Sequence, residues 1–174
     1  SSRERFKELS DRNKEVVERS RRRLEKLLEE NKREVEKSKK RIEDMLRKAD
    51  DLLRKLPVSE ELLRRAKEML RRIKEEVDKV EEDNERVDRE LRKEVKKIED
   101  DNRREDKRLA DEVRRDGVTE RLSEEIKRLI ETHEKLLREL EKKIRDLIRK
   151  HREDVERIIK EIDKLLKKID EDTR

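Results

Sequence analysis

The chain repeats its polar and apolar positions with a period of eighteen along each of three long segments. Three pairs of consecutive windows match in this way: 6–23 with 24–41, 80–97 with 98–115, and 122–139 with 140–157. Eighteen residues make five turns of a straight α-helix at 3.6 residues per turn. The repeat therefore predicts long, nearly straight helices, and it returns polar residues to the same place in the apolar stripe in each cycle.

The composition favours helices over a mixed fold. Charged residues make up 61% of the chain and hydrophobic residues 28%, a balance that without periodicity would indicate disorder. The single Gly and single Pro are typical of long helices, and the absence of Cys excludes a disulfide framework. No apolar run approaches the roughly 18 residues of a membrane span, and residues 1–30 contain no signal-peptide core. We therefore expect a soluble protein with no membrane partner.

Residue types at the ends of the segments predict two tight connections. Ser2 is a plausible N-cap for the first helix, which Pro57 stops. Ser59 caps the second helix, Gly117 ends it in a left-handed conformation, and Thr119 caps the third. The expected helices are residues 2–56, 59–116 and 119–172. Connections this short make neighbouring helices antiparallel.

Each predicted helix carries one apolar stripe, which covers an arc of roughly 120°. One stripe per helix is what a closed three-helix core needs, and no second apolar face is present for a larger assembly. We therefore predict a single all-α domain over residues 1–174, an antiparallel up-down-up three-helix bundle of long, nearly straight helices. The direction in which the three helices wind around one another stays open.

Folding the chain at the two connections brings polar residues of all three helices to the same levels. Residues of the first two helices are level when their numbers sum to about 115, and those of the last two when they sum to about 235. Two polar levels result, Asn13 with Asn102 and His133, and Asn31 with Asn84 and His151. The third corresponding level is apolar and contains Ala49, Ala66 and Ile169. The agreement of three separate stripes supports this register.

Ser and Asp residues flank the two polar levels, within one or two turns of them. Together with Asn and His they predict two buried hydrogen-bond networks. The members are Asn13, Ser20, Asn102, Asp106 and His133, and Asn31, Ser38, Asn84, Asp88 and His151. The alternative is that these side chains are tolerated at a hydrated core edge, and it applies above all to the Ser and Asp, which lie toward the flanks of the apolar stripes. A buried Asn without partners costs about 1–3 kcal/mol, so six coincident Asn and His positions favour the networks.

The acid response of the histidines depends on two opposing effects. Burial lowers the pKa of a His, whereas a nearby carboxylate, here Asp106 or Asp88, raises it. We expect burial to win, because Asn partners can satisfy a neutral imidazole without a charge.

The same residues offer little catalytic or metal chemistry. His133 with Asp106 and His151 with Asp88 could form acid–base dyads, but no Ser or Cys nucleophile stands in a recognisable motif. A thin three-helix bundle also lacks a pocket of substrate size. The two His stand one repeat apart, about 27 Å along a helix, so they cannot share a metal ion. We expect no enzymatic activity, no metal and no cofactor.

Two basic runs, RSRRR at 19–23 and KSKKR at 37–41, raise the question of nucleic-acid binding. Against it, 56 basic residues face 51 acidic ones, and Phe6 is the only aromatic residue available for stacking on bases. A solvated charged face explains the runs better, and we expect no nucleic-acid partner.

The near-perfect repeat, the capped helices and the matched Asn, Ser, His and Asp levels resemble computationally designed helical bundles with buried hydrogen-bond networks. The resemblance covers the whole chain and rests on this pattern. It implies a non-enzymatic scaffold, made in the cytoplasm of a recombinant host, whose polar levels specify helix pairing and register and which requires no partner. The alternative is a designed interaction or switch component that responds to pH through His133 and His151, exchanges helices with a partner helix, or self-assembles. A natural spectrin-like spacer would instead show heptad drift and aromatic core residues.

Overall fold

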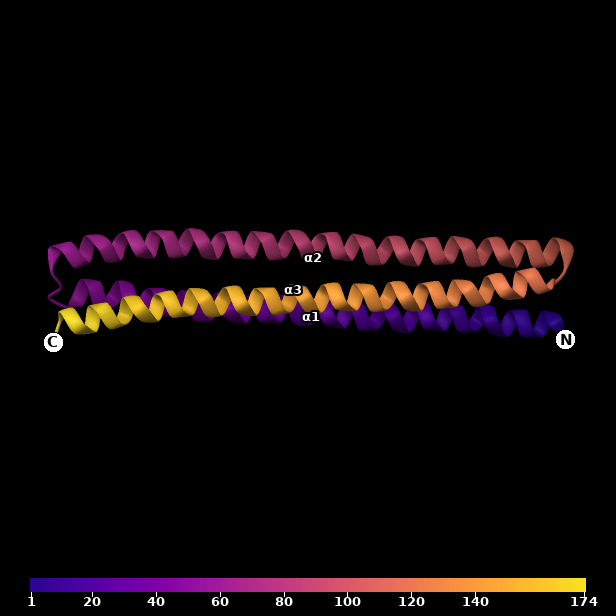
Figure 1. Ribbon diagram of the computed structural model, residues 1–174, viewed down its shortest axis with the longest axis horizontal. Coiled ribbons are helices and arrows are strands. Elements are labelled where there is room, and N and C mark those ends of the chain that lie inside the picture. The colour runs from indigo at the N-terminus through magenta and orange to yellow at the C-terminus, as the bar shows by residue number, and fades with distance from the viewer. The chain divides into compact units, whose positions relative to one another are not determined.

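A computed structural model describes residues 1–174 and contains three α-helices and no strand. Helix α1 spans Ser2–Lys55, α2 spans Glu60–Asp116 and α3 spans Glu120–Asp172 (Figure 1). The helices pack against one another, which confirms the expected all-α three-helix bundle. Their ends lie within one residue of the ends expected from caps and breakers.

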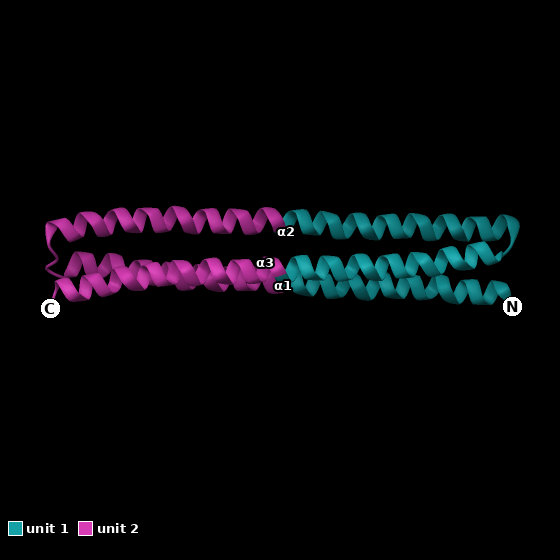
Figure 2. Ribbon diagram, in the orientation of Figure 1, with its two compact units in different colours: residues 1–29, 88–145 teal, residues 30–87, 146–174 magenta.

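The packing groups the chain into two compact units, and each helix contributes to both (Figure 2). Unit 1 contains residues 1–29 and 88–145, and unit 2 contains residues 30–87 and 146–174. The sequence predicts one domain over residues 1–174, and the helices are continuous through both units. The grouping arises because residues on long antiparallel helices contact only residues at similar levels.

The connection from α2 to α3 has the predicted geometry. Gly117 has a φ of +80°, and its N–H donates to the carbonyl of Val113 at 2.8 Å, which is the left-handed C-cap arrangement. The Thr119 hydroxyl oxygen accepts from the N–H of Leu122 at 3.2 Å and caps α3. Both predicted roles are confirmed.

The connection from α1 to α2 is held by a local cap and by a residue distant in sequence. The Ser59 hydroxyl oxygen accepts from the N–H of Leu62 at 3.2 Å, as expected of an N-cap. In addition, the carboxylate of Asp172 accepts from the Ser59 N–H at 3.0 Å. The last residue of α3 therefore places a negative charge at the N-terminus of α2, where the helix dipole favours it.

The start of α1 differs from expectation by one residue. Ser1, and not Ser2, is the N-cap, since its hydroxyl oxygen accepts from the N–H of Glu4 at 3.3 Å. A cap side chain reaches the N–H three residues ahead, so the helix that begins at Ser2 is capped by the residue before it.

Unit 2 has a continuous apolar core at the end of the helices where α1 connects to α2. Its buried members are Ile42, Leu46, Ala49, Leu53, Ala66, Leu70, Ile73, Val155, Ile158, Ile162, Leu165 and Ile169. Ala49, Ala66 and Ile169 are fully buried within it, which confirms the predicted apolar level. The two alanines leave room there for the larger isoleucine.

The core of unit 1 contains a smaller apolar cluster of Phe6, Leu109, Leu122 and Ile126. The repeat predicts Val17 in the core of this unit, and this prediction is wrong: Val16 is buried, at 6% exposed, whereas Val17 is only half-buried. Val16 follows Asn13 by three residues and therefore lies on the same helix face as the buried amide. The prediction rests on the repeat, because Val35 stands at the same place as Val17 in the next cycle.

The predicted register holds within each unit. The bonded pairs Asn13–Asn102 in unit 1 and Asn31–Asn84 in unit 2 both sum to 115. Between α2 and α3, the ion pairs Glu112–Arg121 in unit 1 and Glu76–Arg157 in unit 2 both sum to 233. Rising numbers on one helix meet falling numbers on the next, so consecutive helices are antiparallel.

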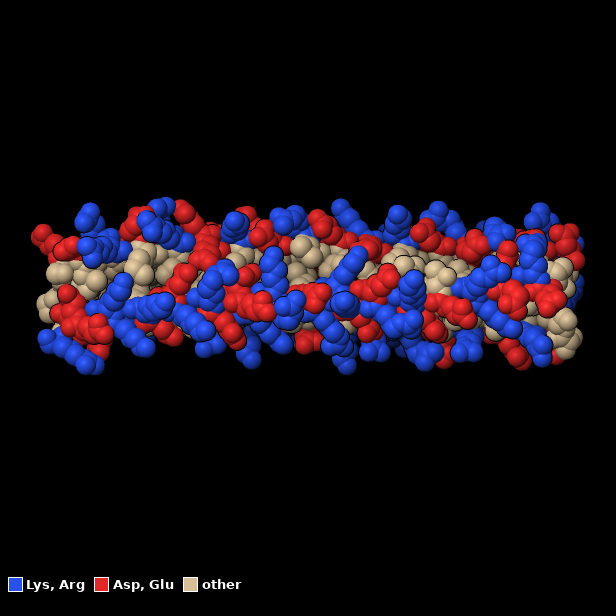
Figure 3. All heavy atoms as spheres, in the orientation of Figure 1, with Lys and Arg blue, Asp and Glu red and all other residues tan.

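The surface carries interleaved charges of both signs. Figure 3 shows Lys and Arg between Asp and Glu over the visible face. No large hydrophobic side chain is exposed. None of the three helices has an apolar stretch of the length that a membrane crossing requires.

Candidate functional site

Two asparagines form the centre of the polar layer in unit 1. Asn13 Nδ2 donates to Asn102 Oδ1 at 2.7 Å, and Asn102 Nδ2 donates to Asn13 Oδ1 at 3.0 Å. Both side chains are buried, Asn13 at 1% exposed. Each amide thus gives and receives one hydrogen bond, which compensates for the loss of water around it. The pair joins α1 to α2 at one level.

The carboxylate of Asp106 extends this layer by one turn. Ser10 Oγ donates to Asp106 Oδ1 at 3.0 Å, and Asn13 Nδ2 lies 3.5 Å from the same oxygen. Lys14 Nζ lies 4.0 Å from the other carboxylate oxygen. Asp106 and Ser10 are both buried, so the carboxylate is compensated by a hydroxyl, an amide and a cation at its edge.

The polar layer of unit 2 has the same amide pair. Asn31 Nδ2 donates to Asn84 Oδ1 at 2.9 Å, and Asn84 Nδ2 donates to Asn31 Oδ1 at 3.0 Å. Asn31 is 1% exposed and Asn84 is 6% exposed. The two reciprocal pairs, which stand one repeat apart on each helix, are therefore equivalent in geometry.

The second buried carboxylate, Asp88, lies in unit 1 and has a different donor. Arg92 Nε donates to Asp88 Oδ1 at 2.6 Å, and the Arg92 guanidinium also contacts Glu29 at 3.5 Å. The repeat explains the difference. Leu28 stands one repeat after Ser10 and cannot donate to Asp88, and Ala110 stands one repeat after Arg92 and cannot donate to Asp106. Where the chain lacks the serine it supplies an arginine, so neither buried carboxylate lacks a donor.

The histidines are buried where expected, but they do not join the hydrogen-bonded pairs. His133 and His151 are each 4% exposed, and both ring nitrogens of each make no hydrogen bond with the protein. The sequence predicts that they bond to Asn and Asp. The reciprocal Asn pairs explain the difference, because each amide directs its bonds between α1 and α2 while the imidazoles project from α3.

Burial lowers the pKa of both histidines. Glu134 opposes the shift at His133, and Asp154 and Glu34 oppose it at His151, but in each case burial dominates. The expected lowering of the pKa by burial is found, but the carboxylates that oppose it are not Asp106 and Asp88, which the sequence predicts for this role. Each ring is therefore neutral at pH 7, with one N–H and one lone pair.

The two predicted network serines lie outside the bonded groups. Ser20 is buried, at 4% exposed, and Ser38 is half-buried. No hydrogen bond from either hydroxyl to an Asn, Asp or His is found. Their hydroxyls lie too far along α1 from the amide levels to reach them, seven residues beyond Asn13 and Asn31.

Sequence reasoning missed Ser10 and Arg92 as ligands of the buried carboxylates. Ser10 has no polar counterpart in the next cycle, so the repeat does not single it out. The register offers a signal, since Ser10 stands one turn before Asn13 and level with Asp106. Arg92 also carries a signal, four residues after Asp88 on the same helix face.

Two glutamates on α2 were also missed. Glu81 and Glu99 stand three residues before Asn84 and Asn102, at equivalent positions of the repeat. Both are half-buried, and burial raises the pKa of both carboxyl groups. Glu99 Oε1 is buried without a hydrogen-bond partner.

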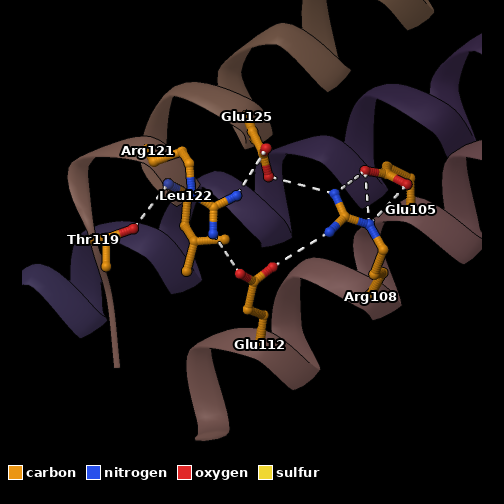
Figure 4. Close-up of polar contacts among 7 residues, drawn as sticks. All are labelled: Glu105, Arg108, Glu112, Thr119, Arg121, Leu122 and Glu125. Carbon is orange, nitrogen blue, oxygen red and sulfur yellow. Dashed lines mark hydrogen bonds and ion pairs between the residues drawn. The ribbon is translucent and has the colours of Figure 1, made fainter. Parts of the chain in front are cut away.

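A closed group of charges lies beside the α2–α3 connection in unit 1 (Figure 4). Arg108 pairs with Glu105, with Glu112 at 3.3 Å and with Glu125 at 3.4 Å. Arg121 pairs with Glu112, and with Glu125 at 3.1 Å. Both arginines thus bridge the same two glutamates, one from each helix. The pKa of the Arg108 guanidinium is raised chiefly by its hydrogen bond to Glu105, and the pKa of the Arg121 guanidinium chiefly by its hydrogen bond to Glu112.

The arrangement defines a class: a three-helix bundle with reciprocal Asn pairs, compensated carboxylates and unbonded histidines buried in its interior. No group of three or more His, Cys, Asp or Glu side chains is placed to hold a metal ion. No known protein family matches the chain, and neither the curated proteins nor the solved structures contain a match to it.

Proposed function

We propose that this chain is a non-enzymatic structural scaffold in which the buried polar layers specify how the helices pair and in which register. The observation that carries the proposal is the reciprocal Asn pair between α1 and α2, formed once in each unit. Such a pair contributes specificity, because a mispaired helix leaves a buried amide without a partner.

Other registers of α1 against α2 satisfy fewer amides. A shift of one repeat in one direction would bring Asn31 to Asn102 but would place Asn84 opposite Ala49. The opposite shift would pair Asn13 with Asn84 and place Asn31 opposite Ala66. Each misplaced buried amide costs about 1–3 kcal/mol. The observed register alone satisfies all four.

A computational design origin, with production in the cytoplasm of a recombinant host, is part of the same proposal. This origin is supported because independent features of the chain all favour the same fold. They are the repeated core positions, the capped helix ends, the left-handed glycine at the turn and the charges of both signs over the surface. A scaffold of this kind requires no cofactor and no partner.

The test compares single and paired removal of the amides. Asn102→Leu and Asn13→Leu, each alone, should lower the unfolding free energy by about 1–3 kcal/mol because each strands its partner. The double variant should be at least as stable as the parent, but it should populate additional oligomers or registers. Chemical denaturation measures the first effect. Native mass spectrometry detects the additional oligomers, and the number of amide resonances in the NMR spectrum detects the additional registers.

The same pair of changes at Asn31 and Asn84 provides a replicate in unit 2. Two results would contradict the proposal. One is a single variant as stable as the double, because the amides would then not act as a unit. The other is a double variant as homogeneous as the parent, because the register would then be set by the apolar residues.

A second candidate function, a component that switches with pH or exchanges helices, is favoured by one observation. Two buried histidines have ring nitrogens without hydrogen bonds, and burial lowers the pKa of both. Protonation would place a charge in the core. A partner helix or self-assembly would then compete with the weakened bundle.

A further inference from the structure

A small cavity lies between α2 and α3 in unit 2, next to the second amide pair. Its volume is about 50 Å³, and Asn84 and His151 line its polar side. Val80, Val87 and Leu147 line its apolar side. The cavity is much smaller than a substrate pocket, which spans about 300–1,000 Å³.

Polar atoms without partners are available at this cavity. Both ring nitrogens of His151 are buried without hydrogen bonds to the protein, and the side chain is 4% exposed. The reciprocal pair uses one N–H and one lone pair of the Asn84 amide, so one of each remains. A buried imidazole left unbonded is destabilising, which favours a guest that both donates and accepts.

The charge around the cavity favours a neutral guest. Asp83 pairs with Arg86 at 3.1 Å, and Asp154 pairs with Arg157 at 3.1 Å, so both carboxylates at the rim are already compensated. Lys150 also lines the cavity, but its side chain is exposed to solvent, so it adds no buried charge. Neither a cation nor an anion would find an unpaired opposite charge in the interior.

We propose that this cavity is a hydration site in which one water molecule bridges the imidazole of His151 and the amide of Asn84. A water molecule occupies about 30 Å³ and needs two to four polar partners, so the size and the lining both suit one. The site extends the amide pair to α3, as a water-mediated layer across three helices. It does not rest on the register role proposed above.

The test detects the water directly. In isotope-labelled protein at pH 7.5, nuclear Overhauser cross-peaks should connect the water resonance to the carbon-bound ring protons of His151. Val80→Ile fills the cavity with one more methylene and should abolish these cross-peaks. Isoleucine at position 80 suits the fold, because Ile98 stands at the same place one repeat later.

Val77→Ile is the matched control, since Val77 stands one turn away and does not line the cavity. It should leave the cross-peaks intact. Val87→Ile, at another residue that lines the cavity, is a second filling variant if Val80→Ile unfolds. Amide spectra and denaturation midpoints confirm that each variant is folded.

Three outcomes would overturn the hydration site. Cross-peaks could be absent in the parent protein, or they could persist in both filling variants. The His151 ring resonances could also shift when chloride replaces a bulky organic anion at constant ionic strength, which would identify an anion as the guest. None of these results bears on the Asn variants, so the register role is tested separately.

Discussion

At the residue scale, the two buried carboxylates are compensated by different hydrogen-bond donors. Asp106 receives its strongest hydrogen bond from Ser10, and Asp88 receives one from Arg92. The serine is neutral and buried, whereas the side chain of the arginine is partly exposed to solvent. Removing the serine therefore tests how much its hydroxyl adds to the amide and the cation that also face Asp106.

Ser10→Ala should lower the unfolding free energy by about 1.5 kcal/mol or more, because the hydroxyl bonds a buried carboxylate. Ser20→Ala is the matched control: it removes an equally buried hydroxyl that contacts no carboxylate. Urea denaturation of the two variants measures the difference. Equal stability of both variants would contradict the assigned role of Ser10.

The histidines should make the bundle sensitive to mild acid. Their folded pKa values lie below the unfolded value of about 6.5, because burial disfavours the cation. The folded state therefore binds fewer protons, and stability is lost as the pH falls through about 6.5 toward the folded pKa. Each histidine can contribute at most about 1.4 kcal/mol per pH unit. Denaturation midpoints at pH 7.5 and pH 5 measure the loss.

The control carries His133→Asn and His151→Asn together. Glu81 and Glu99 act in the opposite direction, since their raised pKa values stabilise the folded state as the pH falls through them. The control retains both glutamates, so the difference between parent and control isolates the histidines. The same pH response in both proteins would rule out a histidine effect.

At the element scale, the turn between α2 and α3 depends on one backbone conformation. Gly117 has a φ of +80°, and a Cβ built there would meet no atom within 4 Å. The need for glycine is therefore conformational and does not come from crowding. The charge group of Arg108, Arg121, Glu112 and Glu125 lies across the same turn, where it favours the closed hairpin (Figure 4).

Gly117→Ala should lower the unfolding free energy by about 1 kcal/mol, the cost of a left-handed conformation for a residue with a Cβ. Gly117→Asn should cost less, because asparagine tolerates this conformation. Thermal denaturation of the two variants provides the comparison. An alanine variant as stable as the parent would show that the turn rearranges freely.

At the scale of the whole molecule, the surface favours a monomer. No large hydrophobic side chain is exposed, and 56 basic residues are interleaved with 51 acidic ones. Further helices would find no apolar face to bury. Light scattering at neutral pH should therefore give a mass near 21.5 kDa. A multiple of that mass would favour the interaction or switch component.

The sequence alone determined the helices, their ends and the levels at which polar residues meet. These features depend on local rules: Gly117, Ser59 and Thr119 act within a few residues of their position. The levels follow from counting residues along regular helices, and the five-turn repeat makes the count consistent across the three stripes. Asn13 and Asn102 could thus be assigned to each other from the sequence alone.

Only the tertiary structure decided which polar groups bond. Counting gives the height of a side chain along a helix, whereas a hydrogen bond also depends on its direction around the axis and on its rotamer, to within a few tenths of an ångström. For that reason Asn13 bonds Asn102 while His133, at the same level, bonds neither, and Ser10, without a polar counterpart in the repeat, bonds Asp106. The same dependence on direction buries Val16 in place of Val17.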